Sequence, residues 1–169
     1  GGTLKWNNGN TQDVSPQLLL IDSKIATFDT NGNDVVLAGV LGGGAVNASL
    51  VKTGAGSLTV GAINNYTGIT TVSEGSLIIN GSVSTGDLTV ASGASLSGSG
   101  TIGGATTIQA GATLSPGNSP GLLTIENTLN LEGTTVMEIG GLSLGTQYDS
   151  IAVSGLLTYG GDLNIVALG

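Results

Sequence analysis

One pattern occurs three times in the chain at a regular 18-residue spacing: Thr71-Val72-Ser73-Glu74-Gly75, Thr89-Val90-Ala91-Ser92-Gly93 and Thr107-Ile108-Gln109-Ala110-Gly111. The second and third copies continue alike, into Ala94-Ser95-Leu96-Ser97 and Ala112-Thr113-Leu114-Ser115, whereas after the first the matching Leu77 comes one place earlier. A unit this short cannot bury its own apolar face, but stacked copies bury one continuous core. The spacing therefore predicts a solenoid of stacked coils.

Short segments of alternating apolar and polar residues surround these repeats, as β-strands require. Glycine recurs throughout, 31 times in 169 residues, which disfavours long helices because each interior Gly costs about 1 kcal/mol relative to Ala. We expect an all-β fold, a right-handed parallel β-helix (β-solenoid) of about eight coils of roughly 18–22 residues each. A β-sandwich is the structural alternative, but its hairpin turns do not explain the 18-residue spacing. The segments are Leu58-x-Val60, Leu77-x-Ile79, Leu88-x-Val90, Leu123-x-Ile125, Leu129-x-Leu131, Ile151-x-Val153 and Leu163-x-Ile165.

No linker interrupts the chain, so we expect residues 1–169 to form a single β-helix segment of a longer protein. Residues 1–53 hold all three lysines and predict irregular N-terminal coils. Residues 54–115 predict the regular repeats, and residues 116–169 predict C-terminal coils with longer loops. A rigid corner, Ser115-Pro116-Gly117-Asn118-Ser119-Pro120-Gly121, separates the last two parts.

The composition excludes several classes of function. The chain has 11 acids, 3 lysines and a net charge of −8, and it contains no Arg, His or Cys. Such a surface is a poor counterion for phosphate, so we expect no nucleic-acid partner. Catalysis through His or Cys, Cys/His metal sites and disulfides are excluded. No apolar run is long enough to predict a transmembrane segment, and no secretion signal opens the sequence.

Three acids spaced six apart, Glu126, Glu132 and Glu138, suggest a glycosidase-like pair, because glycoside hydrolysis uses two carboxyl groups about 5–10 Å apart. Nothing in the sequence makes these side chains face one another. We therefore favour solubilising residues on strands. We assign no catalytic residue and expect no enzyme.

The segment Asp29-Thr30-Asn31-Gly32-Asn33-Asp34 places oxygen ligands at alternate positions, as calcium loops do. It lacks the Gly at the sixth place and the Glu at the twelfth that an EF-hand loop needs. A turn with Asx caps is the favoured interpretation. We assign no metal-binding or cofactor-binding residue and expect no cofactor.

Thr71, Thr89 and Thr107 each precede an inward Val or Ile, which predicts an outward ladder of threonines; Thr59 and Thr124 are placed in the same manner. Ice-binding faces carry two such columns, but the second column here would be Ser73, Ala91 and Gln109. We therefore attribute the single column to β-propensity and packing between threonines.

The aromatic residues are few. We expect Tyr66, Tyr148 and Tyr159 to plug corners of the coil with their hydroxyls in water, although contacts to a glycan or receptor are the alternative. Trp6 is expected to cover the open N-terminal end of the tube.

The order of these motifs resembles the autotransporter-associated β-strand repeat of bacterial type V secretion passengers. The resemblance rests on Gly54–Val60, Asn65-Tyr66-Thr67-Gly68, Thr70-Thr71-Val72 and Glu74-Gly75-Ser76-Leu77, with Ile69 and Gly61-Ala62-Ile63 as departures. Lys52 precedes Thr53-Gly54 in that pattern, and we interpret it as a structural or solubility residue. The resemblance implies a right-handed β-helix, export to the cell surface, anchoring of the full-length protein in the outer membrane, and no catalytic residues.

We therefore expect a structural stalk or scaffold that supports adhesion or display of a distal region. A carbohydrate-active β-helix enzyme, and an adhesin that contacts its host or cell-surface ligand directly, are the alternatives. Adjacent coils of the same chain are the expected partners. Because a solenoid exposes unpaired strands at its ends, we also expect end-to-end self-association unless Trp6 and the Tyr148–Gly169 region cap those ends.

Overall fold

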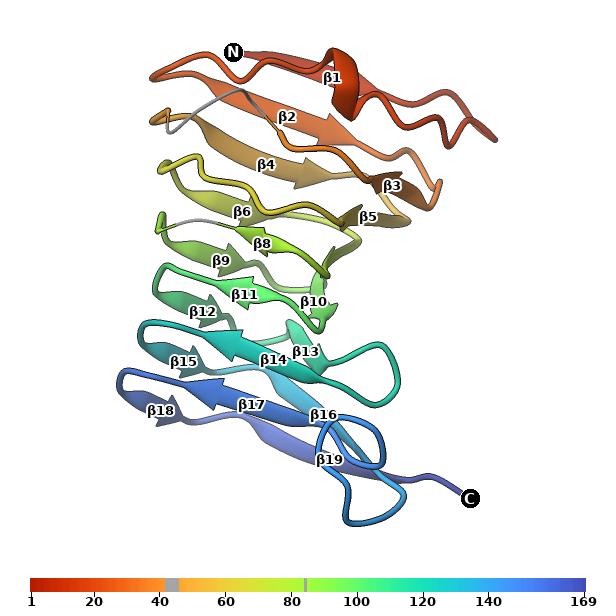
Figure 1. Ribbon diagram of the computed structural model, residues 1–169, viewed down its shortest axis with the longest axis vertical. Coiled ribbons are helices and arrows are strands. Elements are labelled where there is room, and N and C mark those ends of the chain that lie inside the picture. Colours follow the sequence, from red (N-terminus) through yellow and green to blue (C-terminus); the bar gives the residue numbers. More distant parts are fainter. Residues whose placement is uncertain (42–45, 84) are drawn as a thin grey trace.

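The computed structural model describes residues 1–41, 46–83 and 85–169, and these form a rod of stacked coils with the two termini at opposite ends (Figure 1). Every pairing between named strands is parallel and joins neighbouring coils. The strands make three sheets along the rod, with eight, seven and four strands, which we call sheets A, B and C. The described part of the chain contains no α-helix, only a 3-10 turn at Ser15–Gln17. The prediction of an all-β solenoid is confirmed.

The strands follow in a fixed rotation around the rod. Sheet A contains β1 (Gly2–Lys5), β2 (Ile25–Asp29), β4 (Ser49–Thr53), β6 (Thr70–Val72), β9 (Leu88–Val90), β12 (Thr106–Ile108), β15 (Leu129–Leu131) and β18 (Leu157–Tyr159). Sheet B contains β3 (Val35–Leu37), β5 (Ser57–Val60), β7 (Ser76–Ile79), β10 (Ser95–Gly98), β13 (Thr113–Pro116), β16 (Thr134–Ile139) and β19 (Asp162–Ala167). Sheet C contains β8 (Ser82–Val83), β11 (Thr101–Ile102), β14 (Leu122–Ile125) and β17 (Ser150–Val153).

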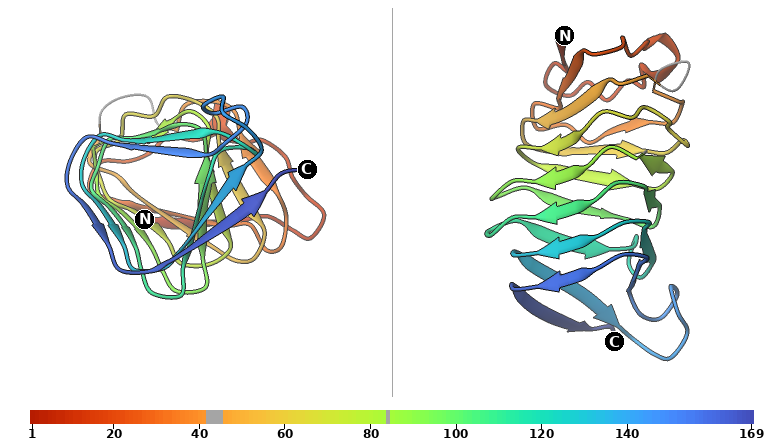
Figure 2. Two further views of the ribbon diagram at one scale, coloured as in Figure 1. Left: turned by 90° about the horizontal axis from the view of Figure 1, so that it is seen from below. Right: turned by 90° about the vertical axis from the view of Figure 1, so that its left-hand side faces the viewer.

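The helix is right-handed. In the left-hand view of Figure 2 the C-terminal coil is nearest the viewer, and the chain runs counterclockwise from β17 through β18 to β19 as it approaches. This is the hand that crossovers between parallel strands almost always take. The eight strands of sheet A correspond to the eight coils that the sequence predicts.

The 18-residue repeat in the sequence corresponds to the pairing register of sheet A. Thr89 pairs with Thr71 on one side and with Thr107 on the other, so each copy of the pattern lies directly beside the next. Coils near the ends are longer, because Ala26 pairs with Leu50, and Leu129 pairs with Leu157. The repeat is therefore visible in the sequence only in the middle of the rod, where the coil is shortest.

The interior is built from columns of like residues, one per coil. In sheet B, Leu58, Leu77, Leu96 and Leu114 lie directly above one another and are fully buried. Burial of each such side chain stabilises the fold by roughly 1.5–3 kcal/mol. One continuous cluster of buried apolar residues runs from Trp6 to Leu131, so the core follows the rod through most of its coils.

The glycine at the end of the repeat occupies one corner of the coil. Gly75, Gly93 and Gly111 have φ values of 69°, 82° and 82°, in the left-handed region that side chains with a Cβ rarely adopt. Each glycine lets the chain turn from sheet A to sheet B within a few residues. The Thr-[Val/Ile]-x-x-Gly pattern is therefore one strand followed by one corner.

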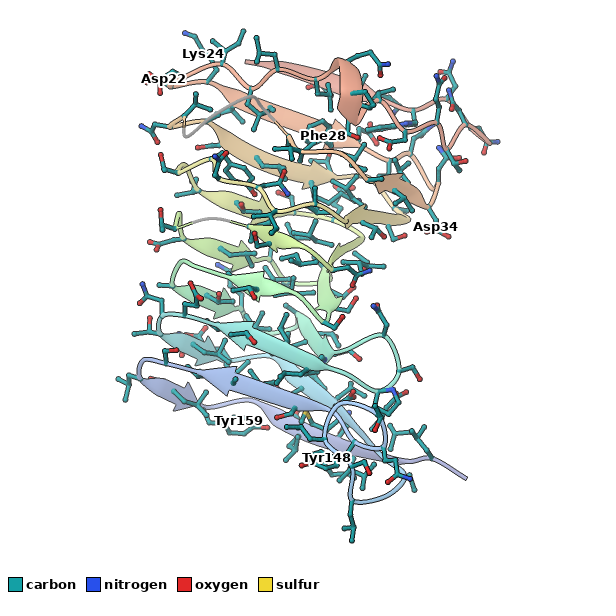
Figure 3. All side chains as sticks on the ribbon, in the orientation of Figure 1. Asp22, Lys24, Phe28, Asp34, Tyr148 and Tyr159 are labelled. Carbon is teal, nitrogen blue, oxygen red and sulfur yellow. The ribbon has the colours of Figure 1, made fainter. Side chains whose placement is uncertain are left out.

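The two ends of the rod differ in how well their interior is covered. In the first coil Trp6 is 3% exposed and Leu20 is 6% exposed. In the last coil the side chains that continue the inward columns are about half exposed: Leu157 (50%), Tyr159 (47%), Leu163 (53%) and Ile165 (55%). Figure 3 places Phe28 near the N-terminal end and Tyr159 in the last coil. The inward side chains of β18 and β19 are thus more exposed than Trp6 and Leu20 of the first coil.

Candidate functional site

Lys52 lies inside the rod, in a column that is otherwise apolar. It pairs with Phe28 in the coil before and with Val72 in the coil after, and its side chain is 0% exposed. Its ammonium Nζ donates hydrogen bonds to the carbonyl oxygens of Thr53 (2.9 Å), Gly54 (2.6 Å) and Glu74 (3.1 Å). The three donors of the ammonium group therefore meet three backbone acceptors. The interpretation of Lys52 as a structural residue agrees with this geometry, whereas a solubility role is wrong because the group does not reach water.

Acidic and basic side chains gather outside this lysine at the corner between sheets A and B. We call the hollow lined by Lys5, Asp29, Asn31, Thr53, Gly54 and Glu74 the charged corner. Lys5 and Asp29 form a salt bridge of 2.9 Å, and Glu74 accepts a hydrogen bond from the backbone N–H of Gly54 (3.2 Å). The charges of this corner are therefore engaged by one another and by the backbone.

Electrostatics at the corner follow from these contacts. The hydrogen bond from Lys5 holds the pKa of Asp29 below its ordinary value. Burial lowers the pKa of Lys52 to about 8, and the charges of Asp29 and Glu74 partly oppose that shift. Lys52 is enclosed by the strand ladder and cannot touch a ligand at the surface. The arrangement is a lock between coils rather than a reaction centre.

The oxygen-rich segment Asp29–Asp34 forms a corner turn. Asp29 Oδ1 accepts the backbone N–H of Asn31 (2.9 Å), an Asx turn, and Asn31 Nδ2 donates to the Trp6 carbonyl (3.1 Å). Asp34 Oδ1 accepts hydrogen bonds from the backbone and the hydroxyl of Ser57 (2.9 and 2.8 Å). Over the residues that the structure describes, no group of three or more acids has the arrangement of a metal site.

The three glutamates lie on three different sides of the coil. Glu126 follows β14 of sheet C, Glu132 follows β15 of sheet A, and Glu138 lies within β16 of sheet B. Glu132 accepts a hydrogen bond from Asn130 (2.8 Å), and Glu138 Oε2 is buried without a hydrogen-bond partner. The structure does not bring these carboxyl groups together as a catalytic pair.

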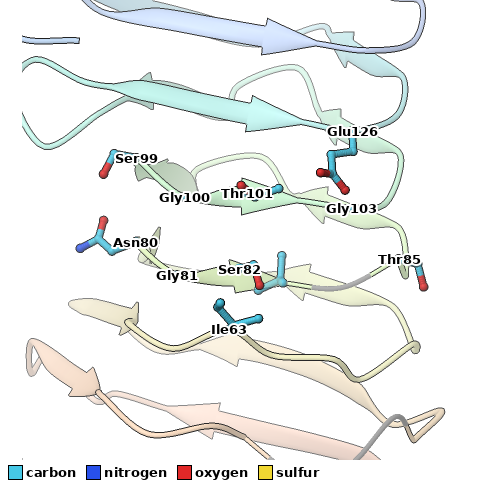
Figure 4. A pocket seen from close by; sticks show the side chains of 11 residues that line it. Ile63, Asn80, Gly81, Ser82, Thr85, Ser99, Gly100, Thr101, Gly103 and Glu126 are labelled. Atoms are coloured by element: carbon cyan, nitrogen blue, oxygen red, sulfur yellow. The ribbon is translucent and has the colours of Figure 1, made fainter.

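A shallow groove crosses the outer face of sheet C, and Figure 4 shows its lining from close by. Small polar side chains cover its floor, with Glu126 at one end and Ile63, which is largely exposed, at the other. Its other labelled side chains come from β8, β11 and the corners beside them: Asn80, Ser82, Thr85, Ser99 and Thr101. Glu126 is the only acid in this lining, so the groove can accept hydrogen-bonding ligands but carries no pair of carboxylates.

The aromatic residues behave differently from one another. Tyr66 is 1% exposed and its hydroxyl lies 2.7 Å from the hydroxyl of Thr70, so the prediction of a water-exposed hydroxyl is wrong here. Burial raises the pKa of Tyr66 to about 12.

Tyr159 is partly exposed on the last coil, and Tyr148 lies in the loop before β17. Trp6 packs against Phe28, with ring centroids 6.2 Å apart, and its indole N–H donates to the Gln12 carbonyl (3.0 Å). It fills the first coil from within.

The threonine ladder exists and is longer than the repeat suggests. The column of Thr71, Thr89 and Thr107 faces outward on sheet A and extends through Val51 to Thr27 and Thr3, and through Asn130 to Thr158. Thr59 and Thr124 also face outward, but they lie on sheets B and C. Sheet B carries a second hydroxyl column that the sequence interpretation missed: Ser57, Ser76, Ser95, Thr113 and Thr134.

Sequence reasoning also missed the buried polar residues. Asp149 is 3% exposed and accepts the backbone N–H groups of Gly121 and Glu138 (both 2.8 Å). Asn64 is buried and accepts the N–H of Leu41 while it donates to the Ser82 carbonyl (3.1 Å). These residues look like ordinary surface or turn residues in the sequence. No spacing or neighbouring residue distinguishes them.

The described helices include none that could cross a membrane. A comparison with curated protein sequences finds no match to this chain. A comparison with protein families finds that residues 50–79 match the family described as passenger-associated-transport-repeat. The matched residues run from the second residue of β4 to the end of β7 and include Lys52, Tyr66 and the first copy of the Thr-[Val/Ile]-x-x-Gly pattern. This match supports an autotransporter passenger repeat region at residues 50–79 of the β-helix.

Proposed function

We propose that this chain is a structural stalk in an exported bacterial surface protein, where it holds a distal region away from the cell. The observation that carries the proposal is the unbroken eight-strand parallel ladder of sheet A around one continuous apolar core. The passenger repeat at residues 50–79 supports export. Anchoring of the full-length protein in the outer membrane, and adhesion through its distal region, belong to the same proposal.

A stalk of this kind works by its shape. Each coil adds about 4.8 Å to the rod, because that is the spacing of hydrogen-bonded strands. Bending the rod would stretch the hydrogen bonds between coils on its convex side, so the stack is stiff. The function requires no reactive group, in keeping with the role of Lys52 and its corner as a lock.

The experiment removes whole coils without disturbing the register. Deletion of residues 70–105 joins residue 69 to Thr106, which occupies the position of Thr70 two coils earlier. The rod should shorten by about 10 Å, measured by small-angle X-ray scattering, and remain folded. In a surface-display fusion, antibody access to a distal epitope should fall with the number of coils removed. Access that does not depend on coil number contradicts the proposal.

The groove on sheet C favours a second candidate, an adhesin that contacts its ligand directly. Thr101→Arg fills the middle of the groove from an outward position and leaves the β11 ladder intact. If the chain is a stalk, this variant and the matched Thr107→Arg on sheet A leave adhesion of the displayed protein unchanged. Loss of adhesion with Thr101→Arg alone would favour the groove.

A further inference from the structure

The groove on the outer face of sheet C lies in the middle of the rod, and sheet A continues through coils on both sides of it. Its hollow has a volume of about 540 Å³. It crosses Ile63, Ser82 and Thr101, which pair one with the next, and ends at Glu126, two residues after the Thr124 that pairs with Thr101. These three steps between coils span about 14 Å. A ligand in the groove would therefore lie extended along the rod axis.

Neutral hydrogen-bonding side chains line the groove. Ser82 and Thr101 lie on the outward side of β8 and β11, and Ser99 lies at the corner before β11. Among the residues that the structure describes, none forms a hydrogen bond with these three hydroxyls, and each can donate one bond and accept two. Asn80 accepts a hydrogen bond from Asn118 through Oδ1 (2.9 Å), which fixes its amide and leaves its NH₂ group as a donor. A ligand rich in hydroxyl groups complements this lining.

Charge restricts the ligand further. In the part of the lining that the structure describes, the one charged side chain is Glu126, an exposed carboxylate at one end of the groove. The chain has a net charge of −8 and no lysine after Lys52. Such a surface repels sulfated, phosphorylated or sialylated ligands and favours neutral or cationic ones. An ammonium group beside Glu126 forms a charge-assisted hydrogen bond, which is roughly twice as strong as a neutral one.

The end of the groove opposite Glu126 is apolar. Ile63 is 77% exposed there, so the C–H face of a sugar ring can pack against it and remove apolar surface from water. The backbone of the floor is already paired, since the N–H groups of Ser82 and Thr101 each donate to a carbonyl of the preceding coil (both 3.0 Å). A peptide therefore cannot add to the floor as a further strand. Recognition in this groove depends on side chains, which favours a sugar over a peptide.

We propose that the groove on sheet C binds a short oligosaccharide that carries free amino groups and lies along the rod axis. The neutral lining pairs with its hydroxyl groups, Glu126 pairs with one amino group, and Ile63 packs against the apolar face of a ring. The inference rests on the second candidate of the proposed function, an adhesin that contacts its ligand through this groove, and it names the class of that ligand.

The test compares three probes for binding to the full chain by isothermal titration calorimetry, at a mildly acidic pH where amino groups are charged. The probes are a glucosamine trimer, the same trimer with every amino group acetylated, and a trilysine peptide. The glucosamine trimer should bind about tenfold more tightly than the acetylated trimer, because it gains one charge-assisted hydrogen bond. Trilysine should bind more weakly than either sugar. A glucosamine trimer that does not bind at millimolar concentration overturns the proposal. Trilysine that binds as tightly as the glucosamine trimer also overturns it, since the acidity of the rod would then be sufficient.

Two variants locate the ligand. Glu126→Gln keeps the size of the side chain and removes its charge, so this variant should bind both trimers with similar affinity. Thr101→Arg fills the groove and should abolish binding of both, whereas the matched Thr107→Arg on sheet A should bind like the parent. Binding that survives Thr101→Arg, or a preference for the amino form that survives Glu126→Gln, contradicts the proposal.

Circular dichroism and thermal melting establish that each variant is folded. If Thr101→Arg reduces adhesion of the displayed protein while no sugar probe binds, the adhesin candidate stands and the assigned ligand is wrong. A rod that binds no probe and still shortens on coil deletion leaves the stalk proposal standing.

Discussion

Two regions of the rod differ in the side chains that hold neighbouring coils together. The first region contains the coils between residues 1 and 83, and the second contains those between residues 85 and 131. The later coils place identical side chains in neighbouring coils, with Thr89 beside Thr107 and Leu96 beside Leu114. The earlier coils begin long, since Ala26 pairs with Leu50, and their corners hold buried polar side chains that reach the next coil. Those contacts join Thr30 to the Ala55 carbonyl (2.7 Å), Asn64 to the Ser82 carbonyl (3.1 Å) and Lys52 to the Glu74 carbonyl (3.1 Å).

The difference lies at the corners of the coils. At the corners of the early coils, the carbonyl oxygens of Thr53, Gly54 and Glu74 accept hydrogen bonds from the ammonium group of the buried Lys52. Buried backbone groups need partners, and polar side chains provide them. The 18-residue coil from Thr89 to Thr107 joins its strands through tight glycine corners. Its buried side chains are apolar except for Thr106, whose hydroxyl donates to the Gly104 carbonyl (3.4 Å).

Leu96→Ala is expected to have the largest effect, in the regular coils. Leu96 is fully buried between Leu77 and Leu114, so the cavity cannot be filled by a polar rearrangement. The free energy of unfolding should fall by about 3 kcal/mol, measured by urea denaturation. Ser97→Ala on the outer face of the same strand is the control and should change it by less than about 0.5 kcal/mol. Equal losses from the two variants would contradict a stack held by its interior columns.

Lys52→Met tests whether the buried polar side chains of the early coils stabilise the fold. Methionine fills a similar volume but leaves the carbonyls of Thr53, Gly54 and Glu74 without their donors. We expect a loss of about 2 kcal/mol at pH 7. Lys24→Met, at an exposed position, should leave the free energy of unfolding unchanged. If Lys52→Met is neutral or stabilising, the ammonium group does not lock the corner.

The pH dependence of stability separates the two regions further. The pKa of Lys52 is about 8 in the fold and about 10.4 when unfolded, so the unfolded chain binds more protons between these values. Stability should therefore rise with pH from about 8 to 10, by about 2 kcal/mol. Above pH 10 the raised pKa of Tyr66 acts in the opposite direction, because the unfolded chain loses that proton first. Denaturant titrations from pH 7 to 11 measure both slopes, and the Lys52→Met variant should lose the rise.

Tyr66→Phe should have the smallest effect of these changes. It removes the hydroxyl that pairs with Thr70 in a buried corner, and it leaves the Thr70 oxygen without that partner. We expect a loss of about 1 kcal/mol, read from thermal or urea unfolding. Tyr159→Phe, on the last coil, is the matched control and should have no measurable effect. A loss in the control as large as in Tyr66→Phe would remove the distinction.

Most of the fold could be predicted because the residues that repeat in the sequence are the residues that pair between neighbouring coils. Thr71, Thr89 and Thr107 pair with one another where the coils have equal length. Thr27 and Thr158 belong to the same column but were not found, because the longer coils near the ends of the rod break the spacing. Periodicity in the sequence reveals stacking only where the loops of successive coils have the same length.

The candidate site was less predictable. Glu126, Glu132 and Glu138 look like a cluster, yet they follow or lie in β14, β15 and β16, which belong to three different sheets, so each falls on a different face. Lys52 looks like a surface residue, and only the pairing of β4 with β2 and β6 shows that it points inward. A charged residue does not reveal by its type on which side of a strand it lies.

The sequence alone predicted a stack of β-coils, since stacking lets short glycine-bounded apolar strands bury their faces. It also indicated the passenger repeat, because that pattern is local in the chain. The tertiary structure alone decided which polar groups are buried and which other residues they contact. Those properties depend on contacts between coils, where residues a whole turn of the rod apart in sequence become neighbours and the chain order no longer shows what each side chain meets.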